Sequence, residues 1–157
     1  MVGMEKNIVP VGEETLAQAG MIHSESWRAS HGFCTPEFVA AHTPDAQTEY
    51  LRREMAAGKS LYLLTDGVPV GIVSVWGNRI ENLYVLPALQ GRGYGSVLLE
   101  FAVRKCDGTP ILWVLNTNEA ARRLYQRRGF RETGRCKELR DGLFEMEMEH
   151  HNGDTGN

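Results

Sequence analysis

The stretch Gln90-Gly91-Arg92-Gly93-Tyr94-Gly95 joins a predicted strand to a predicted helix. A strand is predicted over residues 80–86, which are rich in β-branched and aromatic side chains and precede Pro87. A helix is predicted over residues 93–105, where apolar side chains recur at helical spacing. A glycine-rich turn that opens a helix presents unpaired N–H groups and the positive end of the helix dipole. The turn therefore predicts a site for a phosphate or diphosphate.

The glycine spacing does not match two well-known phosphate loops. A dinucleotide-binding turn needs Gly-x-Gly-x-x-Gly, and here Gly95 comes one residue early. A P-loop ends in Gly-Lys-Ser/Thr, whereas Gly95-Ser96 is followed by Val97. On this segment alone, a tight strand-to-helix turn without any ligand is the alternative.

Two segments together resemble the GNAT N-acetyltransferase superfamily. Gln90, Gly93 and Gly95 match the acetyl-CoA signature of that family, Gln/Arg-x-x-Gly-x-Gly/Ala. Residues 111–130 are similar to its strand-then-helix element, and the matching positions are Asn118, Ala121, Leu124, Tyr125, Gly129 and Phe130. The resemblance is strong over residues 60–149. It implies an α/β, GNAT-like fold with a mixed central sheet flanked by helices, in which two parallel central strands splay apart to admit the pantetheine arm.

Composition is consistent with one ordinary globular domain. The chain has 157 residues, of which 42% are hydrophobic and 24% charged, so it can bury a core. A net charge of −3 gives no basic patch, so nucleic acid is not expected as a partner. There is no apolar run of the roughly 18 residues that a membrane span needs, and no signal peptide is recognised.

The cysteines and the domain boundaries can also be interpreted from the sequence. Cys34, Cys106 and Cys136 are odd in number and widely spaced, which indicates free thiols in a reducing, cytoplasmic setting and no metal site. Residues 1–149 are expected to form a single domain. Residues 150–157 are polar and are expected to be a disordered tail.

The other elements are predicted from periodicity and turn residues. Asp66-Gly67 and Asp141-Gly142 each predict a hairpin turn, Thr35 is expected to cap a short helix, and Asp45 is expected to cap another. The expected strands are residues 7–11, 60–65, 68–76, 80–86, 110–115, 131–139 and 143–149. The expected helices are residues 13–27, 36–41, 45–57, 93–105 and 118–128.

The resemblance also assigns a cofactor site, with acetyl-CoA as the acetyl donor. The diphosphate is expected on Gln90, Gly91, Arg92, Gly93, Tyr94 and Gly95, with the pantetheine arm along the backbone of Leu83, Tyr84 and Val85. Asn118 is expected to cap its own helix and to contact the cofactor. The arginines at positions 122, 123, 127 and 128 are either a solvated helix face or further phosphate contacts.

Two residues are predicted to carry the chemistry. Tyr125 matches the helix tyrosine of the family, whose phenol protonates the leaving thiolate; its alternative role is that of a core aromatic residue. Glu81 is the predicted base, acting directly or through a water, and its alternative role is that of a surface carboxylate. Strand alternation alone does not fix the face of Glu81, because a bulge would change it.

The acceptor side is less defined by the sequence. Trp27, His31, Phe33 and Trp76 are expected to line a pocket for a primary amine of a small molecule or peptide. His23 and His31 are each more typical of a structural histidine than of a catalytic one. Two other functions are compatible with the same residues: a non-catalytic acyl-CoA-binding module, and a protein N-terminal or lysine acetyltransferase. The resemblance also allows a homodimer.

Overall fold

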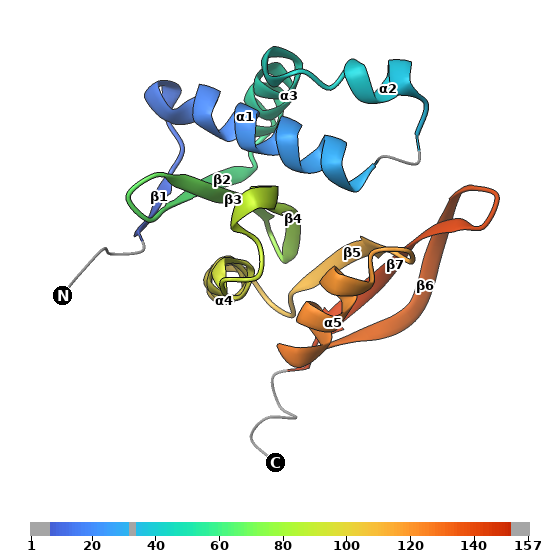
Figure 1. Ribbon diagram of the computed structural model, residues 1–157. Coiled ribbons are helices and arrows are strands. Elements are labelled where there is room, and N and C mark those ends of the chain that lie inside the picture. The colour runs from blue at the N-terminus through green and yellow to red at the C-terminus, as the bar shows by residue number, and fades with distance from the viewer. Residues whose placement is uncertain (1–6, 32–33, 152–157) are drawn as a thin grey trace.

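A seven-stranded mixed sheet forms the centre of the computed structural model, which describes residues 7–31 and 34–151 (Figure 1). The strand order is β1-β2-β3-β4-β5-β7-β6, and every neighbouring pair is antiparallel except β4 and β5. The strands are β1 (Asn7–Pro10), β2 (Ser60–Thr65), β3 (Pro69–Trp76), β4 (Arg79–Val85), β5 (Ile111–Leu115), β6 (Phe130–Arg140) and β7 (Leu143–His150). This is the single α/β domain with a mixed sheet that the sequence predicted.

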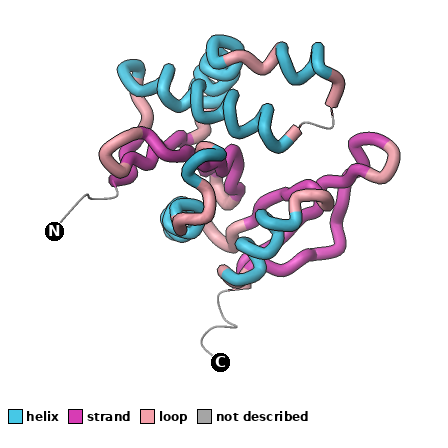
Figure 2. Tube along the Cα trace, in the orientation of Figure 1, coloured by secondary structure: helices cyan, strands magenta, loops and turns pink. Residues whose placement is uncertain are grey.

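Helices cover both faces of this sheet, as Figure 2 shows. The helices are α1 (Glu13–Ser30), α2 (Pro36–Ala40), α3 (Pro44–Ala56), α4 (Tyr94–Lys105), α5 (Glu119–Arg127) and the 3-10 turn η1 (Pro87–Leu89). One buried cluster joins α1 and α3 to the sheet through Ile22, Leu51 and Ile72. A second cluster joins α4 to the opposite face and includes Leu98 and Tyr125.

The two central parallel strands separate, as predicted. Among the described residues, β4 and β5 pair at a single position, Arg79 opposite Ile111. The ladder between β3 and β4 also shifts, because two residues of β4, Asn82 and Leu83, stand opposite the single residue Val73. Such a bulge bends a strand and re-aims its side chains.

The helix boundaries follow the caps. Thr35 accepts the N–H of Phe38 at 3.2 Å, which confirms its predicted cap. The prediction that Asp45 caps α3 is wrong: Thr43 is the cap, and its hydroxyl accepts the N–H of Ala46 at 3.1 Å. The proline that follows Thr43 sets the first helical residue, so the helix begins before Asp45.

The first residues of the expected C-terminal tail are ordered against the rest of the domain. Strand β7 runs to His150, and the N–H of His151 donates to the carbonyl of Gly129 at 2.9 Å. Residues 152–157, the rest of that expected tail, lie outside the described residues. Within residues 7–31 and 34–151, no helix has the length and apolar character that crossing a membrane requires.

Candidate active site

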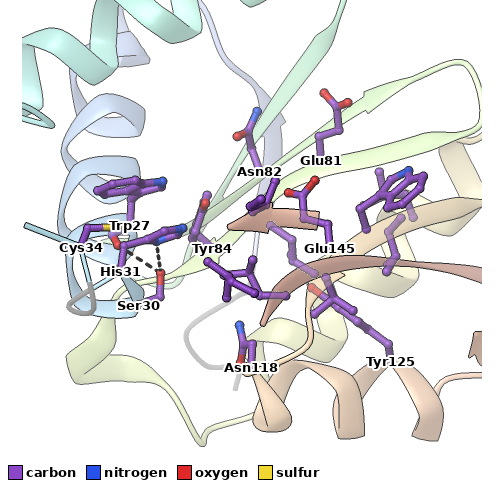
Figure 3. Close-up of a pocket in the computed structure, with 18 of the residues that line it drawn as sticks. Trp27, Ser30, His31, Cys34, Glu81, Asn82, Tyr84, Asn118, Tyr125 and Glu145 are labelled. Carbon is purple, nitrogen blue, oxygen red and sulfur yellow. Dashed lines mark hydrogen bonds between the residues drawn. The ribbon is translucent and has the colours of Figure 1, made fainter. Parts of the chain in front are cut away.

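A cavity of about 390 Å³ lies where β4 and β5 separate (Figure 3). Its walls come from α1, α2, β4, β5, α5 and the β6–β7 hairpin. The predicted site residues that it brings together are Trp27, His31, Glu81, Leu83, Tyr84, Asn118 and Tyr125. The cavity is therefore assembled from both halves of the chain.

Other predicted site residues lie elsewhere. Trp76, at the end of β3, is 48% exposed and sits beneath the ammonium of Lys59, 5.1 Å from its ring centroid; it does not line the cavity. Val85 and the turn 90–95 are also not among the lining residues. Phe33 lies outside the described residues.

The backbone of β4 forms one wall of the cavity. Past Arg79, the edge of β4 that faces β5 has no ladder in the described part of the chain, and Leu83 and Tyr84 line the cavity there. Strand groups without a ladder partner can hydrogen-bond an extended ligand as they would another strand. The carbonyl of Val85 already accepts hydrogen bonds from Gln90 Nε2 at 3.0 Å and Ser26 Oγ at 3.2 Å.

A buried hydrogen-bond chain holds the bulge in β4. Asn82 has a φ of 53°, a left-handed conformation that costs energy for a residue with a side chain. His23 Nε2 donates to Asn82 Oδ1 at 3.2 Å, and Asn82 Nδ2 donates to Ser74 Oγ at 3.2 Å. Gln47 Nε2 donates to His23 Nδ1 at 2.9 Å. Burial, above all, lowers the pKa of His23 to about 4, so the ring is neutral and its role is structural.

The glycine-rich turn has the form of an anion cradle. Gly91 and Gly93 have φ angles of 83° and 90°, which favour glycine, and a Cβ added at either would meet nothing within 4 Å. Gly93 is the N-cap of α4, and no side chain caps the helix. Tyr94 donates its hydroxyl hydrogen to Asp66 Oδ2 at 2.6 Å, which ties the turn to the β2–β3 hairpin. The open backbone and the helix N-terminus fit a diphosphate.

Part of the arginine cluster on α5 is engaged in ion pairs. Arg122 pairs with Glu132 at 2.9 Å, and Arg128 pairs with Glu100 at 2.9 Å. Arg128 Nε also donates to Ser96 Oγ at 3.3 Å, which places this guanidinium beside the first turn of α4. These pairs support the interpretation of a solvated helix face, with Arg128 near the cradle.

Tyr125 enters the cavity from α5. It is 8% exposed and packs near Phe130, with ring centroids 6.1 Å apart. Burial raises the pKa of Tyr125 to about 12, so the phenol keeps its proton at neutral pH. Asn118 caps the same helix, as predicted, because its Oδ1 accepts the N–H of Ala121 at 3.2 Å. This helix therefore brings a neutral proton donor to the cavity.

Aromatic rings build the opposite wall. The indole of Trp27 is stacked between the rings of His31 and His42, at centroid distances of 4.0 Å and 3.5 Å. His31 Nδ1 donates to the carbonyl of Trp27 at 2.9 Å, and burial, above all, lowers the pKa of His31. This wall is flat, apolar and held together by its own contacts.

Several polar residues of the cavity lie outside the predicted site, among them Asn82 and Glu145. Strand alternation alone would put Asn82 on the face opposite Glu81, and the bulge defeats that rule. Strand alternation alone would put Glu145 on the polar face of β7, together with Glu147 and Glu149, and its side chain, 35% exposed, lines the cavity. Alternation separates the two faces of a strand, but it does not tell whether another element encloses the polar face.

Comparisons with known proteins agree with this geometry. The profile described as the acetyltransferase (GNAT) family matches residues 24–130. Among curated proteins, none matches the chain significantly. Apo YjaB from Escherichia coli, a solution structure, superposes with a TM-score of 0.75 at 24% identity over 94% of this chain and 98% of that one.

Two further structures were solved with a bound ligand. PaiA N-acetyltransferase from Thermoplasma acidophilum, in complex with coenzyme A, has a TM-score of 0.67 at 19% identity over 92% of this chain and 98% of that one. YncA from Salmonella typhimurium, with its cofactor acetyl-CoA, has a TM-score of 0.62 at 20% identity over 92% of each chain. At these identities the likenesses show the fold.

Proposed function

The chain belongs to the acetyltransferase (GNAT) family, and we propose that it transfers the acetyl group of acetyl-CoA to a primary amine. The observation that carries the proposal is the cavity between the separated strands β4 and β5, which contains the buried phenol of Tyr125. The proposed reaction is a direct attack, with donor and acceptor bound at the same time. A small-molecule acceptor is favoured, because a cavity of about 390 Å³ would have to hold both the pantetheine arm and the acceptor.

Named residues would hold the donor. The N–H groups at the start of α4, in the turn 90–95, would bind the diphosphate, and the free edge of β4 at Leu83 and Tyr84 would pair with the pantetheine arm. Asn118 lies at the same cavity wall as Tyr125 and would contact the arm. Support comes from the fold neighbours PaiA and YncA, which were solved with coenzyme A and acetyl-CoA.

The chain's own groups supply the proton transfers. Acetyl-CoA brings an acetyl group activated as a thioester. The N–H groups of the β4 backbone are proposed to polarise the thioester carbonyl. A cavity carboxylate, Glu81 or Glu145, would take a proton from the amine, and Tyr125 would give one to the leaving thiolate. Trp27 and His31 would form the wall against which the acceptor lies.

A panel of amines tests the proposal. Alkylamines, aromatic amines, amino acids, polyamines and short peptides are each mixed with the protein and acetyl-CoA, and release of free thiol is followed. With at least one small amine we expect thiol release faster than the hydrolysis of acetyl-CoA alone. Mass spectrometry should then show a product that is heavier than the amine by one acetyl group. Release only with peptides would instead assign a protein N-terminal or lysine acetyltransferase. Cofactor binding without release on any amine would leave a non-catalytic acyl-CoA-binding module.

A further inference from the structure

Two carboxylates line the cavity, and they differ in what already holds them. Glu81 comes from β4 and Glu145 from β7 (Figure 3). A base that takes a proton from a bound ammonium needs an accessible oxygen that is not committed to another cation. The contacts of the two residues therefore bear on which one serves. This inference rests on the proposed acetyl transfer.

Both oxygens of Glu81 face cations, Oε1 closely and Oε2 more loosely. Oε1 lies 2.8 Å from Lys59 Nζ, and Oε2 lies 3.5 Å from Arg79 Nη2. Lys59 also holds Glu54 at 2.6 Å, and the side chains of Lys59 and Glu81 are only 14% and 24% exposed. Burial alone would lower the pKa of Lys59, but its hydrogen bonds to Glu54 and Glu81 raise it overall. Protonating Glu81 would break up this network.

Glu145 is held much more loosely. Its one ion pair in the described part of the chain is with Lys137, and Oε1 and Nζ are 3.9 Å apart. Lys137 is 66% exposed, and ion pairs of that kind contribute little. The same ammonium lies 5.9 Å from the ring centroid of Trp113, which is another residue of the cavity wall. A cationic ligand can therefore replace Lys137 beside Glu145 at small cost.

The surroundings of Glu145 place it near the proposed chemistry. The pKa of Tyr84 is raised, first by burial and then by the neighbouring groups Tyr125, Tyr50 and Glu145. Glu145 also tends to raise the pKa of His31, against the stronger effect of burial. In Figure 3 the carboxylate of Glu145 lies among the labelled lining residues. Glu145 thus lies close enough to Tyr84 and to His31, on the aromatic wall, to affect the pKa of each.

We propose that Glu145 binds the acceptor as an ammonium ion and takes one proton from its nitrogen. The nitrogen lone pair then attacks the thioester carbonyl, so that a C–N bond forms and the C–S bond breaks. Tyr125 gives its proton to the departing sulfur, and the second proton lost from nitrogen returns to the phenolate. Glu145 releases its proton to solvent. In total, an ammonium ion with three N–H hydrogens and a thioester give an amide with one N–H hydrogen, a thiol and a released proton.

Amines of different basicity separate this role from a structural one. The probes are the alkylamine that reacts fastest in the panel, protonated at pH 7, and O-methylhydroxylamine, which is neutral at that pH. For Glu145→Gln we expect kcat/KM at pH 7 to fall roughly 100-fold with the alkylamine but less than about tenfold with O-methylhydroxylamine. The neutral probe has no ammonium proton to lose. Glu145→Asp should recover part of the loss.

Matched variants complete the design. Glu149→Gln makes the same change on the same strand, outside the cavity, and should stay within about twofold of wild type with both probes. Affinity for coenzyme A, measured by calorimetry, should be equal in wild type and Glu145→Gln, which shows that the variant is folded. Glu81→Gln is expected to lose a similar factor with both probes, because its ion pairs support the bulged strand.

Three results would overturn the assignment. Glu145→Gln could match wild type, it could lose the same factor with both probes, or Glu81→Gln could show the probe-dependent loss instead. In each case wild type still releases thiol, so only the identity of the base is wrong. Failure of wild type with every amine would be a failure of the proposed function itself, and the role of Glu145 would fall with it.

Discussion

Tyr125→Phe is expected to lower kcat roughly 100-fold while the Kd for acetyl-CoA changes by less than about twofold. The ring of Tyr125 is buried, so phenylalanine keeps its packing and removes only the hydroxyl. The loss then falls on protonation of the thiolate, a step that occurs after binding. Steady-state kinetics and calorimetric titration of the two proteins measure both quantities. Unchanged turnover would remove Tyr125 as the acid and leave it a core aromatic residue.

The pH dependence of wild type gives an independent check on Tyr125. A proton donor is active below its pKa, and burial raises the pKa of Tyr125 to about 12 from an ordinary value near 10. The protonated range is therefore extended upward, and ionisation of this phenol should cause no loss of kcat between pH 7 and pH 10. A fall in kcat centred between pH 7 and pH 10, present in wild type and absent in Tyr125→Phe, would contradict the assignment.

Gly20→Ala is expected to lower the free energy of unfolding by about 2–3 kcal/mol. In most helix interiors this change stabilises a protein, because alanine is the better helix former. Here a Cβ on Gly20 would lie 2.8 Å from the Cα of Thr48 on α3, and closer still to Thr48 Oγ1. Since a backbone atom is involved, α1 and α3 must move apart. For a chain of this size the melting temperature should fall by roughly 4–12 °C.

Gly95→Ala is the matched control for this prediction. Gly95 is also helical, but an added Cβ would meet only the end of the Leu124 side chain, at 3.2 Å, and that side chain can move. Thermal unfolding of both variants, followed by circular dichroism, should show a large loss for Gly20→Ala and little change for Gly95→Ala. Equal stability of Gly20→Ala and wild type would mean that the α1–α3 contact yields without cost.

The parts of the fold that the sequence predicted well are those set by local chemistry. The Asp66-Gly67 turn requires glycine at a φ of 81°, and the hairpin follows from it. The strand, turn and helix around Gly93 are likewise encoded by neighbouring residues. Thr43 and Asp45 are both good capping residues, so composition alone does not choose between them. The proline at position 44 does, because it occupies the first helical position and makes Thr43 the cap.

The parts of the site that could not be predicted depend on distant contacts. Asn82 is held in its left-handed backbone conformation by a hydrogen bond that His23, 59 residues away in the chain, donates to its side-chain oxygen. The cavity position of Glu145 depends on how the β6–β7 hairpin meets α1 and β4. Trp76, expected to line the pocket, ends its own strand and is 48% exposed.

Calorimetric titration of the protein with acetyl-CoA tests the central claim, that the turn 90–95 and the open edge of β4 form a cofactor site. We expect saturable binding of one molecule per chain, with a melting temperature that rises as the ligand concentration increases. Gly93→Val, which puts a side chain on the open backbone of the turn, should weaken that binding. Absence of heat and of any thermal shift at millimolar acetyl-CoA would contradict the account, because the turn would then be only a connection between a strand and a helix.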